Sequence, residues 1–292
     1  MEFRRVLFRS GHPLIVHVQS SDAARYWVDH IPSYAERLMQ AFWPGPLTLV
    51  LHTSGRPPDT VTGGHDTIAL RVPRQPVMQQ VLRCLADLTA DSTVGIAAPS
   101  ANLFGRVSPT TADHVVADIG AVLRDGDVIL DGGPCSIGVE STIVDCTDEF
   151  PRMLRPGSVA WSSIETAGDV ALGNASDVNA PGNLPTHYAP RAKVVLRNEL
   201  NVEHSELTGS VGLIALADVQ TPDGIVRLLE PSTIQEYARD LYGALREADA
   251  RNVESIVAIL PTGDGLAEAI RDRLEKAARS RDRKSTRLNS SH

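Results

Sequence analysis

Apolar residues gather along the chain in short runs that alternate with polar ones or lie side by side, as in buried β-strands. Gly, Pro, Asn and Asp bound these runs and mark turns. In the first part of the chain we expect strands at Leu14–Val18, Leu47–His52, Thr67–Val72, Ile96–Pro99, Val128–Leu130, Ser141–Asp145 and Met153–Arg155. The last two are close enough in sequence to form a hairpin.

Longer segments carry apolar residues three and four positions apart, the spacing of an amphipathic helix. We expect helices at Ser20–Gln40 with a break at Pro32, at Gln75–Asp87, and at Thr111–Ile119. Strands interleaved with helices predict an α/β fold for this part of the chain.

A segment rich in Gly, Asn, Ala and Asp, from about Ala167 to Pro185, is typical of a linker. Beyond it we expect strands and helices in alternation, which predicts a second, smaller three-layer α/β domain with a partly parallel sheet. The expected elements are strands at Lys193–Leu196, Val211–Leu216 and Val253–Leu260, and helices at Thr233–Asp249 and Gly265–Ala278.

The two ends of the chain do not follow these patterns. Glu2–Ser10 and Asp282–Asn289 can be encoded by opposite strands of one DNA string, which resembles a sequencing adapter. We therefore expect residues 1–10 and 282–292 to be artefactual ends and exclude them from fold reasoning. The natural sequence is then expected to run from about Gly11 to Arg281 and to be cut at both ends.

Charge and composition exclude several classes of protein. The chain has 28 Lys and Arg against 36 Asp and Glu, and the part between the two ends keeps 22 against 34, a net charge of −12. Strong nucleic-acid binding is not expected, because it needs clustered basic residues. No apolar run approaches the ~20 residues that span a bilayer. The three cysteines lack CxxC spacing and the histidines lack HxxxH or HExxH spacing, so neither a disulfide framework nor a metal site is expected.

Ser100 and Asn102, in Pro99-Ser100-Ala101-Asn102, follow a predicted strand at alternate positions and can direct hydrogen-bond donors at one ligand. Ser108-Pro109-Thr110 comes next and begins a helix, whose free amides favour anions. Ser and Asn are also common in turns, so a purely structural role is the alternative.

A second candidate stretch contains Asp131-Gly132-Gly133 and Gly138-Val139-Glu140-Ser141-Thr142, in which Ser141 opens a strand with its hydroxyl at a loop edge. Its glycines permit close approach of a ligand or simply a turn. The chain has neither GxxxxGK[ST] nor GxGxxG, so any nucleotide would bind outside those motifs.

Two arginines stand out because their neighbours are apolar or end a strand. Arg71 lies inside an apolar strand, and Arg155 precedes a Pro-Gly turn. A guanidinium in such a place needs a partner, which can be an anionic ligand or an internal Asp or Glu. In the linker, His187-Tyr188-Ala189-Pro190 can stack on a base, cover a site, or only attach the linker to a domain surface.

Taken in order, the segments HPLIVHV, FWPGPLTLVL, LRVP, APSAN with SPT, LDGG, GVESTIVD, LRPG and HYAP resemble the Sua5/YrdC family of threonylcarbamoyl-AMP synthases, in its two-domain Sua5 form. The resemblance covers about Gly11 to Arg281. It implies a YrdC-like twisted open sheet with flanking helices at 11–166 and a linker with the HYAP motif at 167–191. A C-terminal three-layer, Rossmann-like Sua5 domain follows at 192–281.

The resemblance implies a nucleotidyltransferase that condenses L-threonine, bicarbonate and ATP into threonylcarbamoyl-AMP and pyrophosphate. The product would serve the N6-threonylcarbamoyl modification of tRNA adenosine through downstream transfer machinery in the cytoplasm, without a membrane. Mg²⁺ would be held by the ATP phosphates. No residue is assigned a catalytic role, and catalysis would rest on positioning and charge stabilisation. Carried over by motif, the ATP contacts are Thr67, Ser100, Asn102, Ser108, Arg155 and Tyr188, and the threonine or carbamate contacts are Arg71 and Ser141.

One departure from the family concerns a Lys-x-Arg motif just before the HPLIVHV-like strand. Phe8-Arg9-Ser10 occupies that place here, so we expect little or no synthase activity from the polypeptide as it stands. Two alternative functions fit the sequence less well. A YrdC-like RNA-binding module without synthase activity is disfavoured by the acidic charge. A YrdC-like unit of a hydrogenase-maturation carbamoyltransferase is disfavoured by the HYAP linker, the second domain and the lack of zinc-finger-type cysteine pairs.

Overall fold

A computed structural model describes residues 13–103, 105–173, 178, 188–200 and 209–288, with side chains up to residue 279. The chain divides into two compact units. Unit 1 is Met1–Ser100 with Glu140–Asn183, and unit 2 is Ala101–Val139 with Leu184–His292. Each unit has its own sheet, and each is described by itself. The predicted artefactual ends lie largely outside the described residues.

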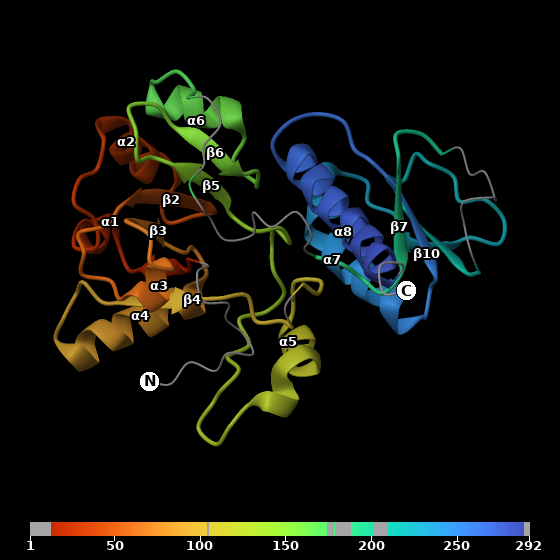
Figure 1. Cartoon of the computed structure of the whole chain (residues 1–292), viewed down its shortest axis with the longest axis horizontal. Coiled ribbons are helices and arrows are strands. Elements are labelled where there is room, and N and C mark those ends of the chain that lie inside the picture. Colours follow the sequence, from red (N-terminus) through yellow and green to blue (C-terminus); the bar gives the residue numbers. More distant parts are fainter. Residues whose placement is uncertain (1–12, 104, 174–177, 179–187, 201–208, 289–292) are drawn as a thin grey trace. The chain divides into compact units, whose positions relative to one another are not determined.

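Unit 1 is built on a six-stranded mixed sheet with the strand order β4-β1-β3-β2-β5-β6. The pairs β1/β3 and β2/β5 are parallel, and the other pairs are antiparallel. Helices α2 and α6 lie together on one side of this sheet (Figure 1). The elements are β1 Ile15–Val18, α1 Ser21–Arg25, α2 Ser33–Phe42, β2 Leu47–His52, α3 Asp59–Thr62, β3 Thr67–Arg71, α4 Pro76–Thr89, β4 Gly95–Ala98, β5 Thr142–Asp145, β6 Arg152–Arg155 and α6 Trp161–Gly168.

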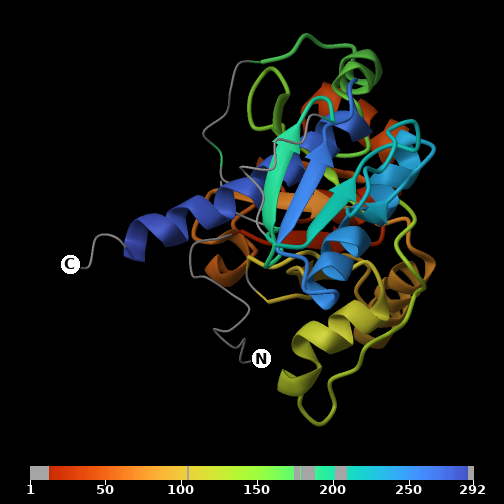
Figure 2. The same cartoon turned by 90° about the vertical axis from the view of Figure 1, so that its right-hand side faces the viewer.

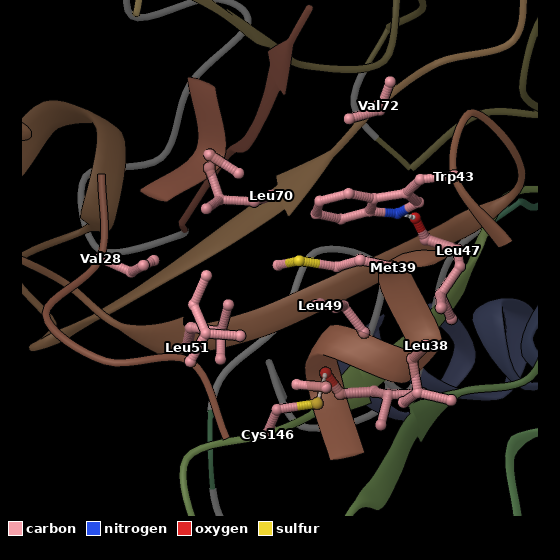
Figure 3. Packing of buried hydrophobic residues seen from close by; sticks show 14 of the residues in the cluster. Val28, Leu38, Met39, Trp43, Leu47, Leu49, Leu51, Leu70, Val72 and Cys146 are labelled. Atoms are coloured by element: carbon pink, nitrogen blue, oxygen red, sulfur yellow. Dashed lines mark hydrogen bonds between the residues drawn. The ribbon is translucent and has the colours of Figure 1, made fainter. Parts of the chain in front are cut away.

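The period of two along each strand divides the side chains of this sheet between two faces. Leu47, Leu49 and Leu51 of β2 share one face and pack with Leu38 and Trp43 in the larger core of unit 1 (Figure 3). The indole nitrogen of Trp43 donates a hydrogen bond of 2.8 Å to the backbone oxygen of Leu47, so the aromatic ring is buried without an unsatisfied donor. This face is the hydrophobic one.

The opposite face of the same sheet holds only a small apolar cluster around Val50, Ala69 and Ile143. Because side chains alternate, the residues two positions away from these on their strands reach the same face. Several of them are polar, and they supply the candidate site described below.

Unit 2 has a parallel four-stranded sheet with the order β7-β10-β8-β9. Figure 2 shows β7, β10 and β8 as adjacent arrows. The elements are α5 Ala112–Ile119 with a 3-10 turn at Gly120–Val122, β7 Lys193–Arg197, β8 Val211–Ile214, β9 Val226–Leu229, α7 Ile234–Ala250, β10 Ser255–Ile259 and α8 Leu266–Leu288.

Helices α7 and α8 bury their apolar sides in one core with the sheet, which includes Tyr237, Leu241 and Leu274. The α7 helix begins with a capping arrangement in which the Thr233 hydroxyl accepts from the Glu236 amide and the Glu236 carboxylate accepts from the Ser232 amide. Among the described residues, the other face of the sheet is packed by loop residues such as Leu200, Val219 and Ile225.

Most of the predicted strands and helices form, but the strand predicted at Val128–Leu130 was wrong. These residues pair with no strand in the described part of the chain, and Val128 and Leu130 are 76% and 61% exposed. Three apolar residues between Gly126 and the Asp131-Gly132-Gly133 turn are too few to hold a strand without a neighbour for their backbone groups. Helices α3 and α6 and strand β9 were not predicted.

Candidate anion-binding site

The polar end of the second face of the unit 1 sheet contains Ser141, Arg155 and Thr48, which are all buried. Arg155 donates from Nε to the backbone oxygen of Ser141 and from Nη2 to its hydroxyl, both at 3.0 Å. The hydroxyls of Ser141 and Thr48 lie 2.7 Å apart. Ser141 is thus fixed by two strands, β6 and β2, just before β5 begins.

Gly157 explains why the turn after Arg155 contains a glycine. A Cβ at this position would lie 2.3 Å from the amide nitrogen of Thr142 and 2.7 Å from the carbonyl carbon of Ser141. No other residue can approach so closely without displacing the backbone that carries the Ser141 hydroxyl. Gly157 therefore allows the turn after Arg155 to pack directly against the backbone of Ser141 and Thr142.

Arg71 is the second guanidinium of the cluster, at the end of β3. Its Nε donates to the backbone oxygen of Gly45 at 2.9 Å. Burial, and after it the positive charge of Arg155, lowers the pKa of Arg71 to about 10. No Asp or Glu lies within salt-bridge distance of Arg71 among the residues the structure describes, so the internal carboxylate partner considered for it is not found there. Two guanidiniums that repel each other favour an anion between or beside them.

His17 is a member of the cluster that the sequence analysis did not single out. It lies on β1 directly opposite Arg71 in the parallel register. Burial, and after it the charge of Arg71, lowers the pKa of His17 to about 4. Its Nδ1 atom is buried and has no hydrogen-bond partner within the described part of the chain. The sequence contains one indication of this role, because His17 is the polar residue in the otherwise apolar strand predicted at Leu14–Val18.

Two other predicted site residues of unit 1 are not part of this cluster. Thr67 is buried at the start of β3, about 13 Å along the strand from Arg71 at ~3.3 Å per residue. Ser100 is exposed in the loop after β4. The structure brings together Arg71, Ser141 and Arg155, and it places Thr67 and Ser100 elsewhere in the unit.

The predicted residues Asn102, Ser108 and Tyr188 belong to unit 2. The Asn102 side-chain nitrogen donates to the backbone oxygens of Leu103 and Arg106, at 3.1 Å each, and so closes its own loop. Its side-chain oxygen is buried and unpartnered among the described residues. Ser108 is buried, and its backbone oxygen accepts from Arg246 at 3.3 Å.

Tyr188 is buried in the hydrophobic core of unit 2, with a left-handed backbone at φ 63°. Its ring stacks on Tyr242 with centroids 5.5 Å apart, and the Arg273 guanidinium lies 5.4 Å from the ring centre. Of the linker alternatives, this arrangement matches attachment to a domain. The neighbouring His187 lies outside the described residues.

The described residues contain neither a metal-binding cluster nor a membrane-spanning helix. No group of three or more His, Cys, Asp or Glu that could hold a metal ion exists within the described ranges. Over the same ranges, no helix is both long and apolar enough to cross a membrane.

Unit 1 thus combines a mixed sheet with a cluster of two arginines, a histidine and a serine, a set of side chains that suits a small anion. Residues 3–157 match the Sua5/YciO/YrdC family model, described as telomere recombination, and residues 157–279 match the threonylcarbamoyl-AMP synthase C-terminal domain. A threonylcarbamoyl-AMP synthase of Pyrococcus abyssi is 36% identical over 287 residues, which cover 92% of this chain and 81% of that protein. The synthase of Bacillus subtilis is 36% identical over 294 residues, covering 93% and 81%.

The solved structure of P. abyssi Sua5 complexed with L-threonine is similar to this fold, with a TM-score of 0.78 at 36% identity. The match covers 94% of this chain and 82% of that one. The chain belongs to the Sua5 family of threonylcarbamoyl-AMP synthases. The predicted family, the α/β fold and the two-domain architecture are confirmed, whereas the boundaries at 11–166, 167–191 and 192–281 stay predictions.

Proposed function

We propose that this chain carries out the reaction for which its relatives are named, as an enzyme of the nucleotidyltransferase class. L-threonine, bicarbonate and ATP would combine to threonylcarbamoyl-AMP, with release of pyrophosphate and water. Membership of the family supports this assignment over the RNA-binding alternative, and so does the L-threonine bound to P. abyssi Sua5. The acidic charge of the chain also opposes strong nucleic-acid binding.

The observation that carries the proposal is the pair of guanidiniums at Arg71 and Arg155. They lie close enough for the positive charge of Arg155 to lower the pKa of Arg71. L-threonine has a carboxylate that one such guanidinium can bind in a forked geometry. In our proposal Arg71 and the Ser141 hydroxyl hold the threonine or carbamate end. His17 stays neutral beside them and can accept or donate a hydrogen bond.

The ATP contacts are proposed from the sequence motifs. They are Thr67, Ser100, Asn102, Ser108, Arg155 and Tyr188. Mg²⁺ would arrive bound to the ATP phosphates. The nucleotide chemistry would need positioning of the reactants and stabilisation of phosphate charge, with no covalent nucleophile from the chain.

The product is a reactive mixed anhydride, so an acceptor enzyme must consume it. We propose that this is the cytoplasmic machinery that transfers the threonylcarbamoyl group to tRNA adenosine. This chain would not hold the tRNA strongly.

The experiment that tests the proposal measures pyrophosphate release from ATP, with and without L-threonine and bicarbonate, together with calorimetric binding of L-threonine. Threonine binding and a release rate that depends on both co-substrates would support the assignment. Binding is the primary measurement, because Phe8-Arg9-Ser10 stands in place of the family's Lys-x-Arg motif and little or no turnover is expected. Failure to bind L-threonine, with tight, salt-sensitive binding of RNA, would favour the RNA-binding alternative.

A further inference from the structure

Arg246, on helix α7, makes an unusual set of contacts with the segment that carries Ser108. Its Nη2 donates to the backbone oxygen of Val107 at 2.5 Å, and its Nε donates to that of Ser108 at 3.3 Å. The same guanidinium forms a forked ion pair with Asp118 of α5, at 3.1 Å and 2.6 Å. The two side chains are only 16% and 15% exposed. One side chain thus joins the Ser108 loop, α5 and α7.

Two further contacts hold the same segment inside unit 2. Val107 is buried in the core formed by α7 and α8. The backbone oxygen of Gly105 accepts from the Ala189 amide at 3.1 Å. The loop around Ser108 is therefore contacted by Ala189 and Arg246, which lie more than 80 positions later in the sequence.

The contacts cross the boundary between the two family models. Ser108 lies in the region matched by the first model, and Arg246 lies in the region matched by the C-terminal domain model. Apart from Tyr188, no residue matched by the C-terminal model has a role in the proposed reaction so far, and these contacts suggest one for Arg246.

We propose that Arg246 is a positioning residue for the nucleotide, which it serves by fixing the backbone of the loop that presents Ser108. The inference rests on the proposed function, in which Ser108 contacts ATP. Arg246 itself touches no substrate in this proposal. Its effect passes through two carbonyl groups that it holds in place.

Arginine suits this role better than lysine because its planar fork reaches two carbonyls and a carboxylate at once. A lysine can satisfy one of these acceptors and keeps the charge opposite Asp118. An alanine leaves Asp118 partly buried without its partner and frees both carbonyls. Arg246→Lys should therefore loosen the Ser108 loop less than Arg246→Ala does.

The test compares these two variants with Arg251→Ala, which removes an exposed arginine just beyond α7 that pairs with Glu247. ATP and L-threonine affinities are measured by calorimetry, and amide hydrogen exchange of residues 105–111 reports the order of the loop. We expect ATP affinity to fall at least about tenfold in Arg246→Ala and less in Arg246→Lys, a loss of about 1.4 kcal/mol or more. L-threonine affinity should stay within about twofold, because Arg71 and Ser141 belong to the other unit.

The lysine variant keeps the test decisive if the alanine variant fails to fold. Unchanged ATP affinity in a folded Arg246 variant whose loop exchanges faster would overturn the proposal. An equal loss of both ligands, or the same loss in Arg251→Ala, would also overturn it, because a general structural effect would then suffice. If the parent chain binds L-threonine but not ATP, or binds neither ligand, the proposed function on which the inference rests is wrong.

Discussion

The guanidinium of Arg155 donates one hydrogen bond to the backbone oxygen of Ser141 and another to its hydroxyl, each 3.0 Å long. Both residues are buried, Arg155 at the end of β6 and Ser141 directly before the adjacent strand β5. This pairing gives the cluster a fixed frame before any ligand binds. It also makes Arg155 a structural residue as well as a proposed ligand of ATP.

Arg155→Met should therefore lower the free energy of unfolding. The substitution leaves two buried oxygens of Ser141 without these donors, at a cost of about 1–3 kcal/mol. Urea-induced unfolding measures the change. Arg83→Ala, which removes an exposed arginine of α4, is the control and should change stability by less than about 0.5 kcal/mol. Equal losses in the two variants would contradict the structural role of Arg155.

Arg71→Met should separate binding from stability. The lost hydrogen bond to Gly45 is offset by removal of a partly buried charge close to a second guanidinium, so the unfolding free energy should change by no more than about 1 kcal/mol. Binding of L-threonine, measured by calorimetry, should weaken about 10- to 100-fold, because a hydrogen bond to a charged group is lost. Normal threonine affinity in this variant would show that Arg71 does not hold the carboxylate.

His17 should make the protein less stable in mild acid. Its pKa is about 4 in the folded protein against 6.5 ordinarily, so the unfolded chain binds the extra proton between these values. The penalty from this group is absent above about pH 7.5, and the free energy of unfolding falls as the pH drops towards 4, by about 1.6 kcal/mol between pH 6.5 and pH 5.

Urea unfolding at these two pH values measures this loss in the parent chain and in His17→Gln, which should show a shallower dependence. His30→Gln, which removes an exposed histidine ahead of α2, is the matched control and should lose stability in parallel with the parent. The prediction does not hold if His17→Gln and the parent lose stability in parallel.

Gly138→Ala should damage the packing of its loop on α7, and Gly64→Ala provides a closely matched control. The two glycines have φ of +84° and +81°, but a Cβ at Gly64 meets nothing within 4 Å. Both variants carry the cost of a left-handed alanine, about 1–2 kcal/mol. Gly138→Ala should lose about 1–3 kcal/mol more from the clash with Ala238 and Arg239. Thermal unfolding of both variants gives the difference, and a difference of zero would argue against close packing at Gly138.

Local patterns predicted much of the fold because most strands have a clear apolar signal. Leu47–His52 formed the strand expected of it, and Gln75–Asp87 became α4 with Gln75 as its cap. Strand β9 was missed because it has only four residues and Arg227 interrupts its apolar run. Helix α6 was missed because its serines, threonine and glycine give little helical signal.

Part of the candidate site was also predictable from local patterns. Arg71 and Arg155 stood out as charges in apolar or strand-ending positions, and the structure places them together. The pairing of β1 with β3, which brings His17 opposite Arg71, is a long-range contact that no local pattern encodes. The packing of residues 101–139 on later elements, through Arg246 and Gly138, could not be predicted, because it also depends on long-range contacts.

Strand order in unit 1 also has a consequence for synthesis of the protein. β2 lies between β3 and β5, and the residue that pairs with Leu47 is Thr142. The ribosome completes β3 soon after β2, but β5 emerges only after the whole of 101–139, which packs in the other unit. During that interval β2 presents an apolar edge without a neighbour, the kind of edge that recruits other chains. The growing polypeptide is therefore most in need of a chaperone while residues between β3 and β5 are being added.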